Sequence, residues 1–174
     1  MATKTTATNA AQIEGWLRDI QFEPSRAIDP VANWRFEVKF PPGSQYQFSV
    51  LNPKKPERSV IVVAQANLAT EHLAAHGRLD DDAKVEFNVA LQEALTRDYV
   101  EFQLLGAPLL ASCPIGFQVQ SVIFDDGLSL DTLAFRMSCT YKTILGGSRC
   151  IHKHLGPGGT DISGQFDFKR LGVQ

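Results

Sequence analysis

The sequence of 174 residues predicts a single domain of the α+β class, a two-layer fold in which helices pack on an antiparallel five-stranded sheet. Two observations lead to this prediction. Runs of alternating apolar and polar residues follow one another across short turns rich in Pro and Gly, as in β-hairpins. Other segments carry apolar residues at helical spacing. The predicted order is α-β-β-β-α-β-β-α, with few of the long crossovers that parallel strands need.

The first predicted element is a short helix. Asn9 can cap it, and Pro24 limits its end to the neighbourhood of Phe22. Its apolar residues recur on one face: Ile13, Trp16, Leu17 and Ile20. The pattern therefore indicates a short amphipathic helix.

Three strands are predicted next. Apolar and polar residues alternate over residues 34–40 and 46–50, and the turn PPGSQ between them predicts a hairpin. Residues 59–64, SVIVVA, are apolar without alternation. We therefore expect this strand to lie inside the sheet with both faces covered, one by helices and the other by another helix or a partner subunit.

The second half of the chain continues with helices and strands. A helical pattern follows in two pieces, a short one over ATEHLAAH and a longer one that Asp80 can cap. Strands are predicted over residues 99–105 and 116–124. A last helix is predicted to begin at Ser129 and to end at GPGG, from Gly156.

Composition argues against several classes of partner. The net charge of -2 and the pI of about 6.1 offer no surplus of positive charge to attract nucleic acid or an anionic membrane. No segment approaches the length of a transmembrane helix. We therefore expect neither nucleic acid nor a membrane among the partners.

The termini and the cysteines predict location and domain limits. Three cysteines at irregular spacing fit a reducing compartment, and the N-terminus lacks the apolar run of a signal peptide, so we expect a cytoplasmic protein. Residues 1–8 are expected to be a disordered leader, residues 9–156 the single α+β domain, and residues 157–174 a Gly-rich C-terminal tail.

Two pairs of side chains have a spacing that suits metal ligands. Cys150 and His154 are four residues apart, as are His72 and His76, and two such pairs could form a tetrahedral site if their helices met. Cys139 and Cys150 cannot share a metal or form a disulfide, because a helix places them roughly 16 Å apart. No zinc-finger or HExxH pattern is present, so we expect exposed helix histidines, no metal and no other cofactor.

Other candidate groups also lack a catalytic context. Cys113 could be a nucleophile, but no recognisable histidine or acid accompanies it. The acids at residues 80–82 suit the dipole of a helix start. Gly146 and Gly147, within the last predicted helix, indicate either a kink or the close approach of another backbone. The sequence therefore predicts no catalytic residues and a protein that is not an enzyme.

The segments IEGWLRDI, WRFEVKFPPGSQYQFSVLNP, ERSVIVVAQANLATEHLAA and VEFQLL resemble the prokaryotic proteins grouped as DUF2299, a family of unknown function. The resemblance covers roughly residues 11–155 and implies the fold of type III secretion chaperones. In that family the helix after the third strand tends to open with Ser-Pro-Glu-His, whereas Ala69 and Thr70 replace the first two residues here. Such domains are commonly homodimers that hold partner polypeptides, so the resemblance implies a homodimer with an unidentified protein partner.

These observations favour a non-enzymatic protein-binding module that acts as a chaperone or adaptor. Its candidate contacts lie in the doubly apolar strand, the last helix and the tail, which could be a docking peptide or a further strand: Val60, Val62, Gly146, Gly147, Phe166 and Phe168. The alternative is a metal-dependent enzyme or a metal-binding sensor that uses His72, His76, Cys150 and His154.

Overall fold

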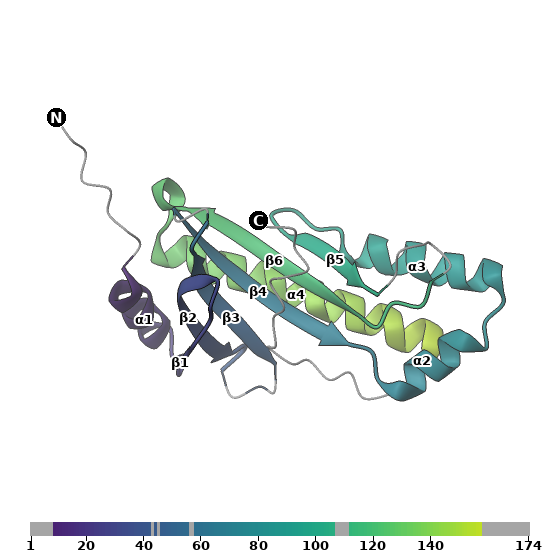
Figure 1. Ribbon diagram of the computed structural model, residues 1–174. Coiled ribbons are helices and arrows are strands. Elements are labelled where there is room, and N and C mark those ends of the chain that lie inside the picture. Colours follow the sequence, from purple (N-terminus) through teal and green to yellow (C-terminus); the bar gives the residue numbers. More distant parts are fainter. Residues whose placement is uncertain (1–8, 43, 45, 56–57, 107–111, 158–174) are drawn as a thin grey trace.

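The α+β class and the antiparallel sheet are confirmed by a computed structural model, which describes residues 9–42, 44, 46–55, 58–106 and 112–157. Figure 1 shows the long helix α4 running along the sheet, with α2 near its C-terminal end. The helices are α1 (Ala10–Asp19), α2 (Thr70–Gly77), α3 (Asp81–Leu95) and α4 (Leu130–Leu155). The strands are β1 (Ser25–Ala27), β2 (Ala32–Lys39), β3 (Gln47–Pro53), β4 (Ser59–Asn67), β5 (Glu101–Leu105) and β6 (Gly116–Phe124).

The strands form one antiparallel sheet in the order β1-β2-β3-β4-β6-β5. Its longest ladder joins β4 to β6, from the pair Ser59 and Phe124 to the pair Asn67 and Gly116. The prediction that residues 59–64 lie inside the sheet is confirmed, because β4 pairs with β3 on one side and β6 on the other. Among the described residues, β5 pairs with β6 alone and β1 with β2 alone, so these strands are the two edges.

The predicted number of five strands is wrong, because β1 adds a sixth. This strand consists of Ser25, Arg26 and Ala27, which are too few and too polar to show an alternating pattern. It follows Pro24 and pairs with β2 at the sheet edge, where a short polar strand protects the edge from other chains. Its pairing, and not its own sequence, makes it a strand.

The main core lies between one face of the sheet and the helices. Side chains from β2, β3, β4 and β6 meet α1, α3 and α4 in one cluster of buried residues. A smaller cluster lies on the opposite face of the sheet and, in the part of the chain that the structure describes, consists of strand residues: Ala32, Leu51, Ile61 and Val63. The lack of alternation in β4 therefore reflects burial on both faces, and helices cover one of them as predicted, whereas the cover of the other face by a further helix or a partner subunit stays a prediction.

The three predicted helix caps are confirmed. The Asn9 side chain accepts a hydrogen bond from the Ala11 amide (3.0 Å), the Asp80 carboxylate from the Ala83 amide (2.8 Å), and the Ser129 hydroxyl from the Thr132 amide (3.1 Å). The helix α4 is continuous over 26 residues, including both glycines. None of the described helices has the length and apolar character needed to cross a bilayer.

The glycine pair in α4 allows close packing inside the domain. A Cβ atom at Gly146 would lie 3.0 Å from the backbone oxygen of Ala94 in α3. A Cβ atom at Gly147 would lie 2.6 Å from the ring of Phe117 in β6 and 2.9 Å from Leu95 in α3. Of the two predicted alternatives, the close approach of another backbone is therefore confirmed, at Gly146.

Candidate functional site

The two histidines of α2 are buried, so the prediction that they are exposed is wrong. His72 is 0% exposed and His76 is 1% exposed. Their spacing of four residues places both on the face of α2 that packs against the rest of the domain. The Nε2 atom of His72 lies 3.2 Å from the backbone oxygen of Gly156, the residue that caps the end of α4.

The four predicted metal ligands do not converge. His76 and His154 both pack against Phe87, with ring centroids 5.5 Å and 6.0 Å from that ring. His72 instead lies beside His152, at 5.5 Å between ring centroids. Within the described ranges, no group of three or more His, Cys, Asp or Glu side chains could hold a metal ion.

The cysteines have the properties of structural thiols. All three are unpaired and half-buried. Burial raises the pKa of Cys113, and the Cys113 thiol lies 3.6 Å from the backbone oxygen of Pro114. Burial also raises the pKa of Cys150, a rise that Lys153 opposes and Glu93 reinforces. A raised pKa reduces the thiolate fraction at neutral pH, and the thiolate is the reactive form.

Cys113 and Cys150 are therefore expected to react with iodoacetamide more slowly than free cysteine at about pH 7.5, where a raised pKa leaves little thiolate. Mass spectrometry of the alkylated peptides would measure each rate separately. The same protein in urea is the control, because unfolding should return both thiols to the rate of free cysteine. If Cys113 of the folded protein were alkylated faster than free cysteine, it would again be a candidate nucleophile.

The predicted partner contacts lie inside the domain where the structure describes them. Val60 and Val62 are fully buried in the main core, so their assignment as contact residues is wrong. The pattern of an interior strand was read correctly, but α4 of the same chain covers this face. Gly146 and Gly147 pack against α3 and β6 instead of a partner. Phe166 and Phe168 lie outside the described residues.

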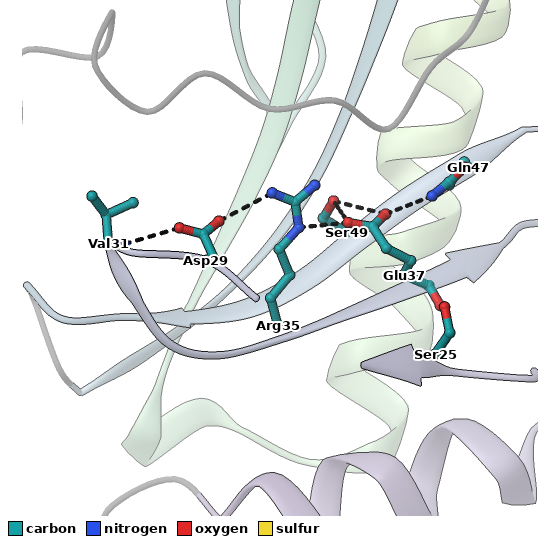
Figure 2. A network of polar contacts seen from close by, with 7 residues as sticks. All are labelled: Ser25, Asp29, Val31, Arg35, Glu37, Gln47 and Ser49. Carbon is teal, nitrogen blue, oxygen red and sulfur yellow. Dashed lines mark hydrogen bonds and ion pairs between the residues drawn. The ribbon is translucent and has the colours of Figure 1, made fainter. Parts of the chain in front are cut away.

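A network of charged side chains lies on β2 and the segment before it. Arg35 donates to Asp29 at 3.0 Å and also to Glu37, so one guanidinium bridges two carboxylates (Figure 2). The three side chains are only 10%, 4% and 13% exposed, respectively. Glu37 also accepts hydrogen bonds from Ser49 (3.0 Å and 3.1 Å) and Gln47 (3.0 Å) of β3.

This network is built for structure and not for proton transfer. Both carboxylate oxygens of Glu37 already accept hydrogen bonds, one from Ser49 and Gln47 and the other from Ser49 and Arg35. A general base needs an oxygen that can reach a substrate proton. The network instead ties β2 to β3 and to the segment that carries Asp29, at the same edge as β1.

A cavity of about 420 Å³ adjoins this network. Its lining comes from the turn after α1, from β1 to β3 and from Pro42: Gln21, Phe22, Glu23, Ser25, Glu37, Val38, Lys39, Pro42 and Gln47. The Ser25 hydroxyl lies 3.5 Å from the backbone oxygen of Glu37, and the described part of the lining contains no histidine or cysteine. A backbone oxygen cannot act as the general base that activates a serine nucleophile.

An exposed aromatic cluster lies beside the other sheet edge. Tyr99, just before β5, is 61% exposed, and Phe135 on α4 is 50% exposed. Their rings form an edge-to-face pair with centroids 5.7 Å apart. The guanidinium carbon of Arg136 lies 4.5 Å from the centroid of the Tyr99 ring. We call Tyr99, Phe135, Arg136 and the adjoining strand β5 the edge patch.

The edge patch is held in place by the backbone of Tyr99. This residue has a φ of 66°, in the left-handed region that a bulky side chain rarely adopts. Its backbone oxygen accepts hydrogen bonds from the Ser121 hydroxyl (2.9 Å) and from Arg136 (3.1 Å). Backbone strain of this kind persists where surrounding contacts enforce it, and it concentrates at functional positions.

The edge patch did not emerge from the sequence prediction. The sequence predicts Tyr99 to be the first residue of a strand, whereas β5 begins at Glu101 and the Tyr99 ring is exposed. One signal for Phe135 was available, because an aromatic residue that falls outside the apolar spacing of an amphipathic helix is expected to be exposed.

The fold has a relative of known structure. A crystal structure of an uncharacterized protein from Methanothermobacter thermautotrophicus aligns with a TM-score of 0.75 and 23% sequence identity, over 84% of this chain and 98% of that chain. At this level of identity the likeness shows the fold alone. No curated protein matches the sequence. The family described as "Uncharacterized conserved protein (DUF2299)" matches residues 10–146, and the chain therefore belongs to this family.

Proposed function

We propose that this protein is a non-enzymatic protein-binding module, chaperone- or adaptor-like, that works as a homodimer. The observation that carries this proposal is the edge patch, in which an exposed aromatic pair lies beside an edge strand. The proposal includes a cytoplasmic location and membership of the wider group of type III secretion chaperone-like folds. Each part is open to a separate test.

The chemistry of the edge patch suits a polypeptide partner. An edge strand presents backbone N–H and C=O groups that another strand can pair with. Tyr and Arg are enriched among the residues that dominate binding energy at protein interfaces. The strained Tyr99 and the Arg136 contacts hold the aromatic pair in one geometry, which reduces the entropy lost on binding.

The edge patch also suits a second copy of the same chain. A twofold dimer places the same surface on both sides of its interface, so the surface must complement itself. Arg97, Asp98 and Glu101 are exposed around Tyr99 and provide both signs of charge. Pairing of β5 with its symmetry mate would extend the sheet across the dimer and cover the β5 edge of both copies.

Light scattering after size exclusion is expected to give twice the chain mass of 19.2 kDa for the wild-type protein. The double variant Tyr99→Asn/Phe135→Gln should weaken dimerisation by roughly 30-fold or more, as for the loss of an interface hot spot. Asparagine tolerates a positive φ and glutamine favours helices, so neither change should unfold the protein. A dilution series would measure the dissociation constant.

Ile28→Ser is the matched control. Ile28 is a fully exposed apolar residue between β1 and β2, at the opposite edge of the sheet. Its replacement should leave the dimer unchanged. A wild-type protein that stays monomeric at all concentrations would contradict the homodimer. If the double variant dimerised as strongly as the wild type, the dimer interface would have to lie outside the edge patch.

A pull-down from the native organism tests the adaptor role. The wild type and the double variant would be immobilised in parallel, and bound proteins identified by mass spectrometry. We expect proteins that the wild type retains and the double variant loses, whereas Ile28→Ser keeps them. Identical sets from the wild type and the double variant would contradict partner binding at the edge patch.

A further inference from the structure

We propose that α2 is an acid-released flap, which docks on α3 and α4 while His76 is neutral and leaves them when this histidine becomes charged. This device is independent of the edge patch, because α2 does not belong to it. Figure 1 shows α2 at the end of α4, away from β1 to β3.

The docking of α2 depends on its two histidines. His72 and His76 are the buried residues of this helix, and Leu73 is half-buried against the main core. No side chain caps the first turn, since Ala69 stands at the N-cap. A helix of eight residues is too short to be stable by itself in water, so tertiary contacts must hold it.

His72 links α2 to the end of α4. The backbone oxygen of Gly156 accepts hydrogen bonds, so the Nε2 atom of His72, at 3.2 Å, is the donor. The Nδ1 atom is buried and has no hydrogen-bond partner among the described residues. A buried polar atom without a partner destabilises the docked state.

His76 is placed in the same way against α3. Its ring meets the Phe87 ring edge-on, with centroids 5.5 Å apart. Its Nε2 atom is buried and has no partner in the part of the chain that the structure describes. Burial lowers the pKa of His76 below its ordinary value of 6.5, and the charge of Lys84 lowers it further.

The charged groups of α3 and of α2 itself do not reverse this effect. Lys84 faces His76 from α3, and its ammonium group is paired with Asp81 at 3.0 Å. Glu71 on α2 and Arg78 at its C-cap are exposed and of opposite sign. Neither element therefore provides a buried carboxylate to neutralise a charged His76.

The last turn of α4 carries no carboxylate that could stabilise a charged His76. Its charged or polar residues are basic: His152, Lys153 and His154. His154 packs against the same Phe87 ring as His76, and His152 lies 5.5 Å from His72 between ring centroids.

The sign of the pH dependence follows from the lowered pKa of His76. Released α2 binds more protons than docked α2 between that lowered pKa and the ordinary value of 6.5. Docking is therefore at full strength above about pH 6.5 and weakens as the pH falls below it. Release would uncover the Phe87 ring, which is fully buried in the docked state, while the sheet keeps its own ladders.

Hydrogen exchange of the full-length chain tests the flap. Protection at residues 70–77, corrected for the intrinsic effect of pH, is expected to fall between about pH 7.5 and about pH 5.5, by up to about tenfold, the limit for one histidine at the lower pH. Protection in β4 should not change over this range. Loss of protection in α2 and β4 together would overturn the proposal, because that result indicates global unfolding in acid.

The variant His76→Leu removes the titrating group. Leucine replaces a ring whose buried nitrogen has no described partner. We expect α2 of this variant to stay protected at the lower pH, whereas the control His152→Gln still shows release. Equal release in His76→Leu and the wild type would overturn the proposal.

An NMR titration of the wild-type histidines provides a measurement that needs no variant. The resonances of His76 and of the α2 amides should shift together, with a midpoint below 6.5. Protonation of His76 without any change in the α2 amides would overturn the proposal. This result would not bear on the proposed homodimer, because dimerisation is tested with variants of the edge patch.

Discussion

Arg35→Ala is expected to lower the free energy of unfolding by about 3–5 kcal/mol, the usual cost of removing one member of a buried ion pair. The change would leave the carboxylates of Asp29 and Glu37 with 4% and 13% exposure and without the cation between them. Urea denaturation monitored by circular dichroism would measure the loss. In a domain of this size each kcal/mol corresponds to a fall of about 2–4 °C in the melting temperature.

Arg26→Ala is the matched control for this prediction. Arg26 also pairs with a carboxylate, that of Glu14, but its side chain is 67% exposed, so solvent screens the pair. Its loss should change the free energy of unfolding little. The triple variant Asp29→Asn/Arg35→Met/Glu37→Gln should recover most of the stability, because it buries no unpaired charge. Equal effects of Arg35→Ala and Arg26→Ala would show that the network contributes no more than a surface pair.

Gly147→Val is expected to lower the free energy of unfolding by about 3 kcal/mol, because it overfills a packed core. The first added carbon alone would lie 2.6 Å from Phe117 and 2.9 Å from Leu95, and both side chains are fully buried. They cannot turn into solvent, so α4 would have to move away from β6 and α3. Thermal and urea denaturation would measure the cost.

Gly15→Ala separates packing from helix propensity. Gly15 lies within α1, and a Cβ atom there would meet nothing within 4 Å. Alanine should therefore raise the stability by about 0.5–1 kcal/mol, the usual gain in a helix interior. If Gly147→Val were no more destabilising than a surface substitution, the close packing of α4 would not hold in solution.

The sequence predicted those parts of the fold that local chemistry determines. Asn9, Asp80 and Ser129 cap the helices as expected, because a side-chain oxygen at a helix start satisfies nearby backbone amides. The unbroken apolar run of β4 correctly indicated an interior strand. The strand β1 was missed because its structure depends on pairing with β2, and Ser25, Arg26 and Ala27 show no pattern by themselves.

The candidate sites were harder to predict because they depend on contacts between distant elements. The spacing of His72 and His76 shows only that they share one face of α2, and the packing of α2 against α3 and α4 buries that face. Tyr99 and Phe135 are brought together by the turn before β5 and the outer face of α4. No local pattern links residues so far apart. The buried position of Val60 also depends on which layer covers β4, which periodicity does not reveal.

The order of strands has a consequence for how the chain must reach this structure. The strands β1 to β4 follow one another in sequence and in the sheet, so they can pair as they emerge from the ribosome. The other edge of β4 stays unpaired until β6 has been synthesised, and β6 follows α2, α3 and β5 in the sequence. Until then β4, one of the most apolar segments of the protein, has an unpaired edge that can pair with a strand of another chain. Synthesis of residues 116–124 is therefore the step that ends the exposure of the nascent chain to aggregation.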